Sequence, residues 1–168
     1  SSPSPPLRVL DGTWFLRAAH GDRSAAAEFA SRRIPTASFF DLDGLSLPAT
    51  ETTLPHMLPR GEVFARRVEA ELGLGSADEV VVYDALGQFS AARCWWTLVV
   101  MGGTKVRLLD GGLPRWIKEG RDVETGPPKV YPPRPVGAWT FDPARLAKVV
   151  HVREMEAAVR AFAEGKAS

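Results

Sequence analysis

The sequence predicts an α/β fold in which helices flank a central parallel sheet on both faces. Short apolar runs and helical patterns alternate about four times along the chain, at the spacing of strand–helix units. Residues 80–83 form the strongest strand pattern, and they are apolar without alternation, as in a parallel strand covered on both sides. The 168 residues, 45% apolar and 24% charged, suit one globular domain with a core.

The first part of the chain predicts two strands, one helix and a long loop. Residues 7–12 read as a strand that ends on a turn, and residues 37–40 as a second strand. A helix is expected over residues 25–33, because Pro35 ends its apolar pattern. Residues 46–59 contain several turn formers and no periodicity, which predicts a surface loop.

The second part continues the alternation. An amphipathic helix begins at Gly61 and ends at the glycines near residue 73. Ser90 is the expected N-cap of a further helix, which ends at residues 102–103. A strand over residues 105–109 and a short helix over residues 113–118 complete the pattern.

Aspartates follow the predicted strands, and they mark one edge of the sheet. The carboxyl ends of parallel strands share an edge, which is where such sheets bind ligands. The most site-like stretch is residues 79–96, where a buried strand, a glycine-bearing loop and a helix start follow one another. Such a loop presents backbone N–H groups and the positive end of a helix dipole, which suits an anion. The aspartates expected on this edge are Asp11, Asp41, Asp84 and Asp110.

The last quarter of the chain differs from the rest. Residues 126–137 hold five prolines in twelve positions, which predicts an extended connector. A helical segment that opens at Asp142 then carries the chain to its end. We therefore predict a domain over residues 1–125, and over residues 126–168 a connector and helical segment that lead to a second, absent unit.

Composition excludes several classes of function. The net charge of +1 without a basic stripe argues against nucleic acid as a partner. The longest strongly apolar run, residues 95–101, is too short to span a membrane. One cysteine allows no internal disulfide, and no Cys/His spacing suits structural zinc. We expect no cofactor and no metal. The chain opens with Ser1 rather than Met, so any targeting peptide is expected to have been removed.

A set of motifs then identifies a family. They are residues 33–43 (RIPTASFFDLD), 55–59 (PHMLP), 81–84 (VVYD), 89–96 (FSAARCWW) and 109–116 (LDGGLPRW). With these motifs in order, the chain from residue 7 to about residue 162 resembles the N-terminal half of the two-domain sulfurtransferases, the rhodanese and 3-mercaptopyruvate sulfurtransferase family. The resemblance implies a rhodanese-like fold. Arg33, Thr36 and Ala92 depart from the usual His, Gly and Pro of the family.

The resemblance also implies that this half is not catalytic. In the family, the catalytic cysteine of the second half lies on the loop that corresponds to residues 84–93. It takes sulfur from 3-mercaptopyruvate or thiosulfate as a persulfide and passes it to a thiol or cyanide. Asp84 and Ala85 stand at the matching place here, and a carboxylate cannot carry transferable sulfur. We expect an inactive loop of Asp84, Ala85 and Arg93, with Asp84 and Arg93 facing each other across it.

Three residues match positions where the first half of the family lines the pocket of the second. Asp43 and His56 would hold polar groups of the sulfur donor, and Phe89 would form an apolar wall. Their ordinary alternatives are a turn aspartate, a loop histidine and simple packing. Removing the second half should also leave an apolar surface near Phe89, Trp116 and Phe162.

Cys94 is the one candidate nucleophile of the chain itself. A reactive thiol needs exposure and a lowered pKa. Cys94 lies ten residues beyond Asp84 and inside the predicted helix, with Leu98 and Met101 on its face. An inert, buried thiol is therefore the preferred interpretation.

Three functional interpretations stay open. The first is the non-catalytic half of a sulfurtransferase, which braces a second, catalytic rhodanese domain in the same protein or in a separate chain. The second is a stand-alone pseudo-rhodanese that serves as a structural subunit or binds protein, with a larger assembly as partner. The third is a single-domain enzyme that uses Cys94. The resemblance places the protein in mitochondria or cytoplasm.

Overall fold

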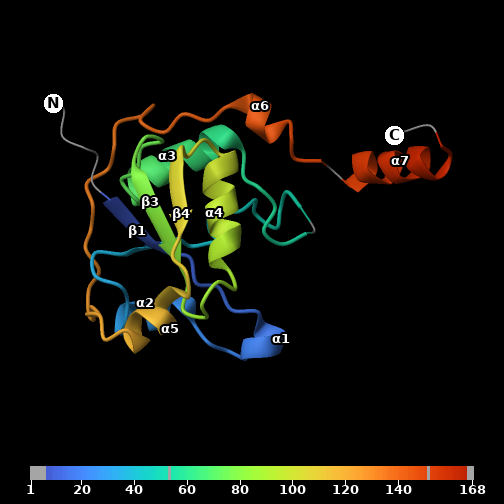
Figure 1. Cartoon of the computed structure of the whole chain (residues 1–168). Helices are drawn as coiled ribbons and strands as arrows, with labels where there is room; N and C mark the ends of the chain where they lie inside the picture. The colour runs from blue at the N-terminus through green and yellow to red at the C-terminus, as the bar shows by residue number, and fades with distance from the viewer. Residues whose placement is uncertain (1–6, 53, 151, 166–168) are drawn as a thin grey trace.

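The computed structural model describes residues 7–52, 54–150 and 152–165, and these residues build a twisted parallel sheet wrapped by helices (Figure 1). The sheet has four strands in the order β2-β1-β3-β4, and every pairing in it is parallel. The strands are β1 (Leu7–Asp11), β2 (Ser38–Phe39), β3 (Glu79–Tyr83) and β4 (Lys105–Leu108).

The register of β1 and β3 places their carboxyl ends side by side, as expected. Leu7 of β1 pairs with Glu79 of β3, and Asp11 pairs with Tyr83 at the other end. Asp11 and Asp84 therefore share one edge of the sheet, at the point where the strand order reverses between β1 and β3. Both are almost fully buried, whereas Asp41 and Asp110 are exposed.

Helices cover both faces of the sheet, as predicted. Side chains of α3 (Gly61–Glu71) and α4 (Ala91–Val100) share the larger hydrophobic core with β1 and β3. Side chains of α2 (Ala25–Ser31) and α5 (Gly112–Lys118) form the smaller core on the opposite face, around Tyr83. Alternate residues of β3 point to opposite faces, so Val82 joins the larger core and Tyr83 the smaller.

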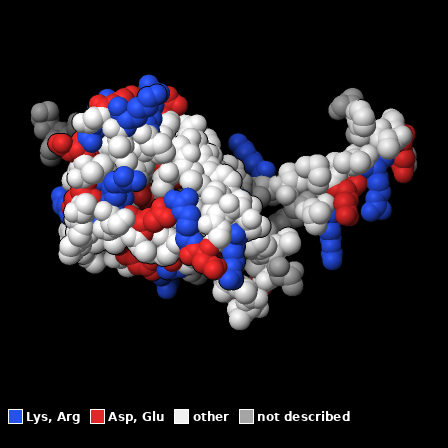
Figure 2. All heavy atoms as spheres, turned by 90° about the horizontal axis from the view of Figure 1, so that it is seen from below, with Lys and Arg blue, Asp and Glu red and all other residues white. Residues whose placement is uncertain are grey.

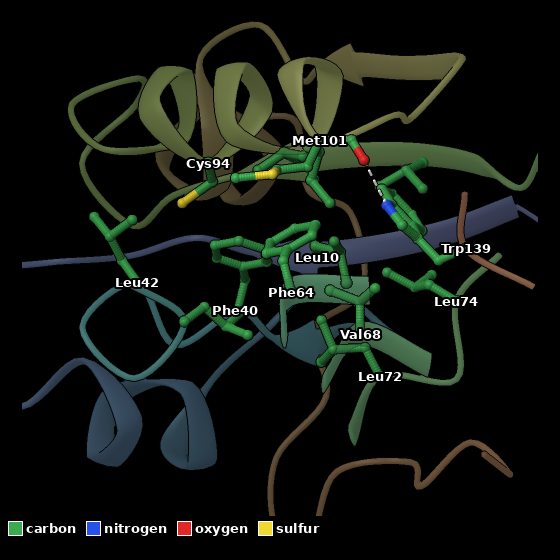
Figure 3. Close-up of a cluster of buried hydrophobic side chains, with 14 of the residues drawn as sticks. Leu10, Phe40, Leu42, Phe64, Val68, Leu72, Leu74, Cys94, Met101 and Trp139 are labelled. Atoms are coloured by element: carbon green, nitrogen blue, oxygen red, sulfur yellow. Dashed lines mark hydrogen bonds between the residues drawn. The ribbon is translucent and has the colours of Figure 1, made fainter. Parts of the chain in front are cut away.

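The segment that directly follows the proline-rich connector packs on the domain. Trp139 is only 2% exposed and packs edge-to-face on Phe64, with ring centroids 5.8 Å apart. Its indole N–H donates to the carbonyl of Met101 at 2.7 Å (Figure 3), and Glu69 accepts its backbone N–H at 2.7 Å. Trp139, two residues beyond the proline-rich stretch, therefore completes the larger core.

Arg33 holds the start of this connector. Its side chain is fully buried, and its guanidinium donates to the carbonyls of Gly126 at 2.7 Å and Pro127 at 2.9 Å. It also pairs with Glu124 at 3.2 Å. Arg33 therefore has a structural role, although it replaces the usual histidine of the family.

The structure differs from the predicted elements at three places. The segment after Asp142 forms two helices, α6 (Pro143–Leu146) and α7 (Val152–Ala163), and α7 lies apart from the sheet with no buried residue (Figure 1). A one-turn helix, α1 (Arg17–His20), was not expected, because four residues show no periodicity. Ser90 is the N-cap residue of α4, as predicted, but its hydroxyl makes no capping bond and donates to the Gly12 carbonyl at 2.8 Å.

Candidate functional site

The loop between β3 and α4 is organised by the carboxylate of Asp84. Oδ1 accepts the backbone N–H groups of Leu86 at 2.8 Å and Gln88 at 3.0 Å. Oδ2 accepts those of Ser90 and Ala91, each at 2.8 Å. The carboxylate is fully buried. The backbone N–H groups that could bind an anion thus already donate to a side chain of the loop itself.

This arrangement changes the expected anion cradle. Backbone donors at a helix N-terminus favour negative charge, and here Asp84 supplies that charge. Ala85 donates its N–H to the Thr13 hydroxyl at 2.9 Å, which ties the loop to the segment after β1. The loop therefore has the shape of an anion site, with its own carboxylate in the place of the anion.

Arg93 does not pair with Asp84, so that expectation is wrong. Its guanidinium instead donates to the backbone carbonyl of His56 and lies over the ring of Trp96, 4.7 Å from the centroid. Burial lowers the pKa of Arg93. Because all four of the Asp84 bonds described above run to backbone groups, the carboxylate already has its partners without an arginine.

Cys94 is a buried thiol, as expected. Its side chain is fully buried in the larger core, where Figure 3 shows it among Leu42, Phe40 and Met101. Burial raises the pKa of the thiol, and the nearby carboxylates of Asp11 and Asp84 raise it further. The thiolate, which is the nucleophilic form, is thus strongly disfavoured.

Asp43 and His56 meet on the surface at the same edge. Asp43 Oδ1 lies 2.6 Å from His56 Nε2, and an ionised carboxylate can only accept, so the imidazole donates. In the neutral ring this leaves Nδ1 as the acceptor. The side chain of Asp43 is 67% exposed and that of His56 is 20% exposed. A hollow of about 320 Å³ is lined by this pair and by loop residues 46–49, 52, 54 and 55.

Trp14 joins this pair, although the sequence did not single it out. Its indole N–H donates to Asp43 Oδ2 at 3.1 Å. Its ring meets the His56 ring edge-to-face, with centroids 4.7 Å apart and planes at 82°. Its backbone N–H donates to the Ser90 hydroxyl at 2.9 Å. A signal existed, because an aromatic residue directly after a strand-ending turn lies at the ligand-binding edge.

The backbone of His56 is in the left-handed region, with φ of 56°. That conformation is uncommon outside glycine and is found where surrounding contacts enforce it, often at functional sites. The bond from Arg93 to the His56 carbonyl is such a contact. The structure thus assigns Arg93 to the support of His56.

Phe89 stands apart from that pair. It is 50% exposed at the tip of the loop, and its ring packs edge-to-face on His20 of α1 at 5.2 Å. Phe162 is 74% exposed on α7, whereas Trp116 packs against the smaller core. Phe89 and Phe162 are thus exposed, whereas Trp116 is only partly exposed.

Within residues 7–52, 54–150 and 152–165, no cluster of three or more metal-type ligands occurs. None of the helices in that part of the chain combines the length and the apolar character needed to cross a bilayer. On the side shown in Figure 2, acidic and basic side chains are interspersed around an uncharged stretch.

The sheet, the flanking helices and the loop after β3 define a class of protein. A model of the rhodanese-like domain matches residues 20–119, and the chain belongs to this family. The fold is also that of solved members. The crystal structure of 3-mercaptopyruvate sulfurtransferase from Escherichia coli matches with a TM-score of 0.77 and 36% identity, over 90% of this chain and 55% of that chain.

Similar sequences are sulfurtransferases. The chain is 50% identical to thiosulfate/3-mercaptopyruvate sulfurtransferase 1, mitochondrial, of Arabidopsis thaliana, over 72% of this chain and 31% of that protein. It is 41% identical to human 3-mercaptopyruvate sulfurtransferase, over 89% of this chain and 48% of that protein. The chain thus spans between about a third and half of the length of these curated relatives, as a single domain of a two-domain enzyme would.

Proposed function

We propose that this chain is the non-catalytic, N-terminal half of a sulfurtransferase that moves sulfane sulfur from 3-mercaptopyruvate or thiosulfate to a thiol or cyanide. The observation that supports it is the buried carboxylate of Asp84 in the loop after β3. This carboxylate uses the loop donors for itself, and no thiolate can form there. The inert Cys94 offers no replacement.

Its role is to brace a catalytic half and to line one wall of the cleft between them. The Asp43–His56 pair provides a carboxylate and an oriented imidazole that can hold the polar end of a sulfur donor. Phe89 provides an exposed apolar ring on the same edge, supported from behind by His20. These groups bind and orient, whereas the sulfur-carrying thiol belongs to the partner half.

The end of the chain supports a partner half. Helix α7 carries four exposed apolar residues at helical spacing and buries none of them: Val152, Met155, Val159 and Phe162. Such an unpartnered stripe is typical of a helix that packs against another element. We propose that the second rhodanese domain covers this stripe.

Complementation tests the proposal directly. The purified 168-residue chain is given 3-mercaptopyruvate or thiosulfate with cyanide, and we expect no thiocyanate. A chimera in which the chain replaces the N-terminal half of the Escherichia coli 3-mercaptopyruvate sulfurtransferase should turn over donor, whereas the catalytic half alone should not. Turnover by the 168 residues alone, abolished by alkylation or by Cys94→Ser, would overturn the proposal in favour of an enzyme that uses Cys94.

A stand-alone structural subunit is the second candidate, and the exposed α7 stripe suits it too. The sulfur transferase subunit of yeast mitochondrial complex I matches with a TM-score of 0.76 and 27% identity. A folded chimera without activity, together with stable capture of α7 by a larger assembly, would favour this candidate. Given this relative and the mitochondrial one from Arabidopsis, we propose a mitochondrial location.

A further inference from the structure

The Asp43–His56 pair is open to solvent on the side of Asp43. The Asp43 carboxylate is 67% exposed, so water competes with the imidazole for its oxygens. Exposed pairs of this kind contribute little and are screened by salt. If the pair is to present one fixed imidazole tautomer to a ligand, another group has to restrain it.

Trp14 provides that restraint from two directions. The indole N–H donates to Asp43 Oδ2 at 3.1 Å, while Oδ1 accepts the proton of His56. The two bonds use different oxygens, so together they fix the rotation of the carboxylate. The Trp14 ring also meets the His56 ring at 82°, which limits rotation of the imidazole.

Trp14 is in turn anchored in the buried part of the fold. Its backbone N–H donates to the Ser90 hydroxyl at 2.9 Å, and that hydroxyl donates to the Gly12 carbonyl at 2.8 Å. The Ser90 N–H is held by Asp84 Oδ2 at 2.8 Å. Ser90 is only 4% exposed. A continuous path of hydrogen bonds therefore runs from the loop after β3 to the exposed pair.

We infer that Trp14 is a positioning residue that fixes the Asp43–His56 pair and keeps the proton of the neutral imidazole on Nε2. The loop after β3, which has no thiol, anchors Trp14 through Ser90. His56 Nδ1 is then held as a hydrogen-bond acceptor. The catalytic consequence rests on the proposed function, whereas the tautomer rests on the geometry of this chain alone.

The first experiment therefore needs no enzyme activity. Ring nitrogens of the ¹⁵N-labelled 168-residue chain are observed by NMR at about pH 8, where an ordinary imidazole is neutral. Trp14→Phe keeps an aromatic ring and removes only the indole donor. Because one hydrogen bond is worth about 1 kcal/mol, we expect the ratio of the Nε2–H to the Nδ1–H form of His56 to fall about fivefold.

Trp116→Phe is the matched control. Trp116 lies on α5, and its indole N–H donates to the Asp122 carbonyl at 2.7 Å. The change removes this N–H and keeps an aromatic ring. The His56 ratio should be unchanged in this variant. An unchanged ratio in Trp14→Phe, or an equal change in both variants, would overturn the inference.

A second variant covers the case in which Trp14→Phe fails to fold. Asp43→Asn changes an exposed side chain and removes one carboxylate oxygen, so the fold should persist. We expect the indole N–H resonance of Trp14 to move and the Nε2–H preference of His56 to weaken. A Trp14 resonance that stays in place would contradict the bond on which the inference depends.

Activity is the last measurement, in the chimera with a catalytic half. Trp14→Phe should lower kcat/KM about fivefold, by the same single hydrogen bond, while Trp116→Phe leaves it unchanged. A wild-type chimera without turnover would count against the proposed function and leave the tautomer result standing. A changed tautomer with unaltered kcat/KM would overturn the catalytic part of the inference.

Discussion

The carboxylate of Asp84 lies 2.8 Å from the backbone nitrogen of Ala91, the first residue of α4. A buried negative charge thus satisfies the N-terminal end of this helix, where backbone donors lack partners within the helix. Residue 84 precedes the helix by several positions, so the whole loop between them is folded around this side chain. Four backbone N–H groups of the loop and helix start are therefore bonded to Asp84 and are not free to bind an anion.

Asp84→Asn should destabilise the protein. In Asp84, Oδ2 accepts the backbone N–H groups of Ser90 and Ala91. An asparagine amide NH₂ in its place would point a donor at these two donors. We expect a loss of about 2–4 kcal/mol in the free energy of unfolding, measured by urea denaturation. Asp110→Asn, at an exposed position, should cost under about 1 kcal/mol. Equal losses in the two variants would contradict the capping role.

Gly12→Ala should show how tightly the lone thiol is packed. A Cβ at Gly12 would lie 2.6 Å from Cys94 Sγ and 3.0 Å from Cys94 Cβ. Overpacking of this kind costs about 1–3 kcal/mol. Adding Cys94→Ala removes the sulfur and should recover part of the loss. A double-mutant cycle in urea checks this, and strictly additive effects would show that the two residues do not compete for space.

Thr36→Gly should stabilise the protein. Thr36 has φ of 67°, a left-handed conformation that costs a residue with a Cβ about 1–2 kcal/mol. Its contacts with Glu124 and Tyr131 use backbone atoms and survive the change. After the entropic cost of glycine, a gain of about 0.5–1 kcal/mol is expected in thermal or urea unfolding. Thr36→Ala keeps a Cβ and should gain nothing, so a similar gain in both would contradict relief of strain.

Glu124 should contribute to the pH dependence of stability. The Thr36 N–H lowers the pKa of this carboxyl most, and the Arg33 guanidinium lowers it further. Its contribution is therefore present above the ordinary glutamate pKa and is lost as the pH falls through the lowered value. Glu124→Gln should lower the urea midpoint at pH 7. In acid, its midpoint should approach that of the wild type.

The control for this pH effect is Glu62→Gln, at an exposed position in the first turn of α3. Its difference from the wild type should be small at both pH values. A Glu124→Gln deficit that persists undiminished in acid would mean that the charge of Glu124 is not its source.

The sequence predicted the sheet and the state of Cys94 because both depend on local pattern. The unbroken apolar run at residues 80–83 indicated a strand covered on both faces, and the structure confirms this for Val82 and Tyr83. The position of Cys94 inside an apolar helix was sufficient to predict its burial. The family of the chain followed from short motifs in a fixed order, and the comparisons confirm it.

Contacts between distant segments could not be predicted in this way. Arg93 is close to Asp84 in sequence, yet its partner is the carbonyl of His56, 37 positions away. Trp14 and Asp43 are joined across 29 positions by a single indole N–H. Such bonds depend on how the loops are placed after the sheet has formed, and hydrophobic periodicity carries no information about that. The substrate-facing roles of Asp43, His56 and Phe89 stay predictions.

The packing of Trp139 also has a consequence for a chain that is still being synthesised. The last strand of the sheet ends at Leu108, but the larger core remains open until the indole arrives some thirty residues later. A nascent chain released into solution as far as α5 would expose the face of Phe64 that Trp139 covers. The larger core therefore cannot be completed on the ribosome before residue 139 has emerged.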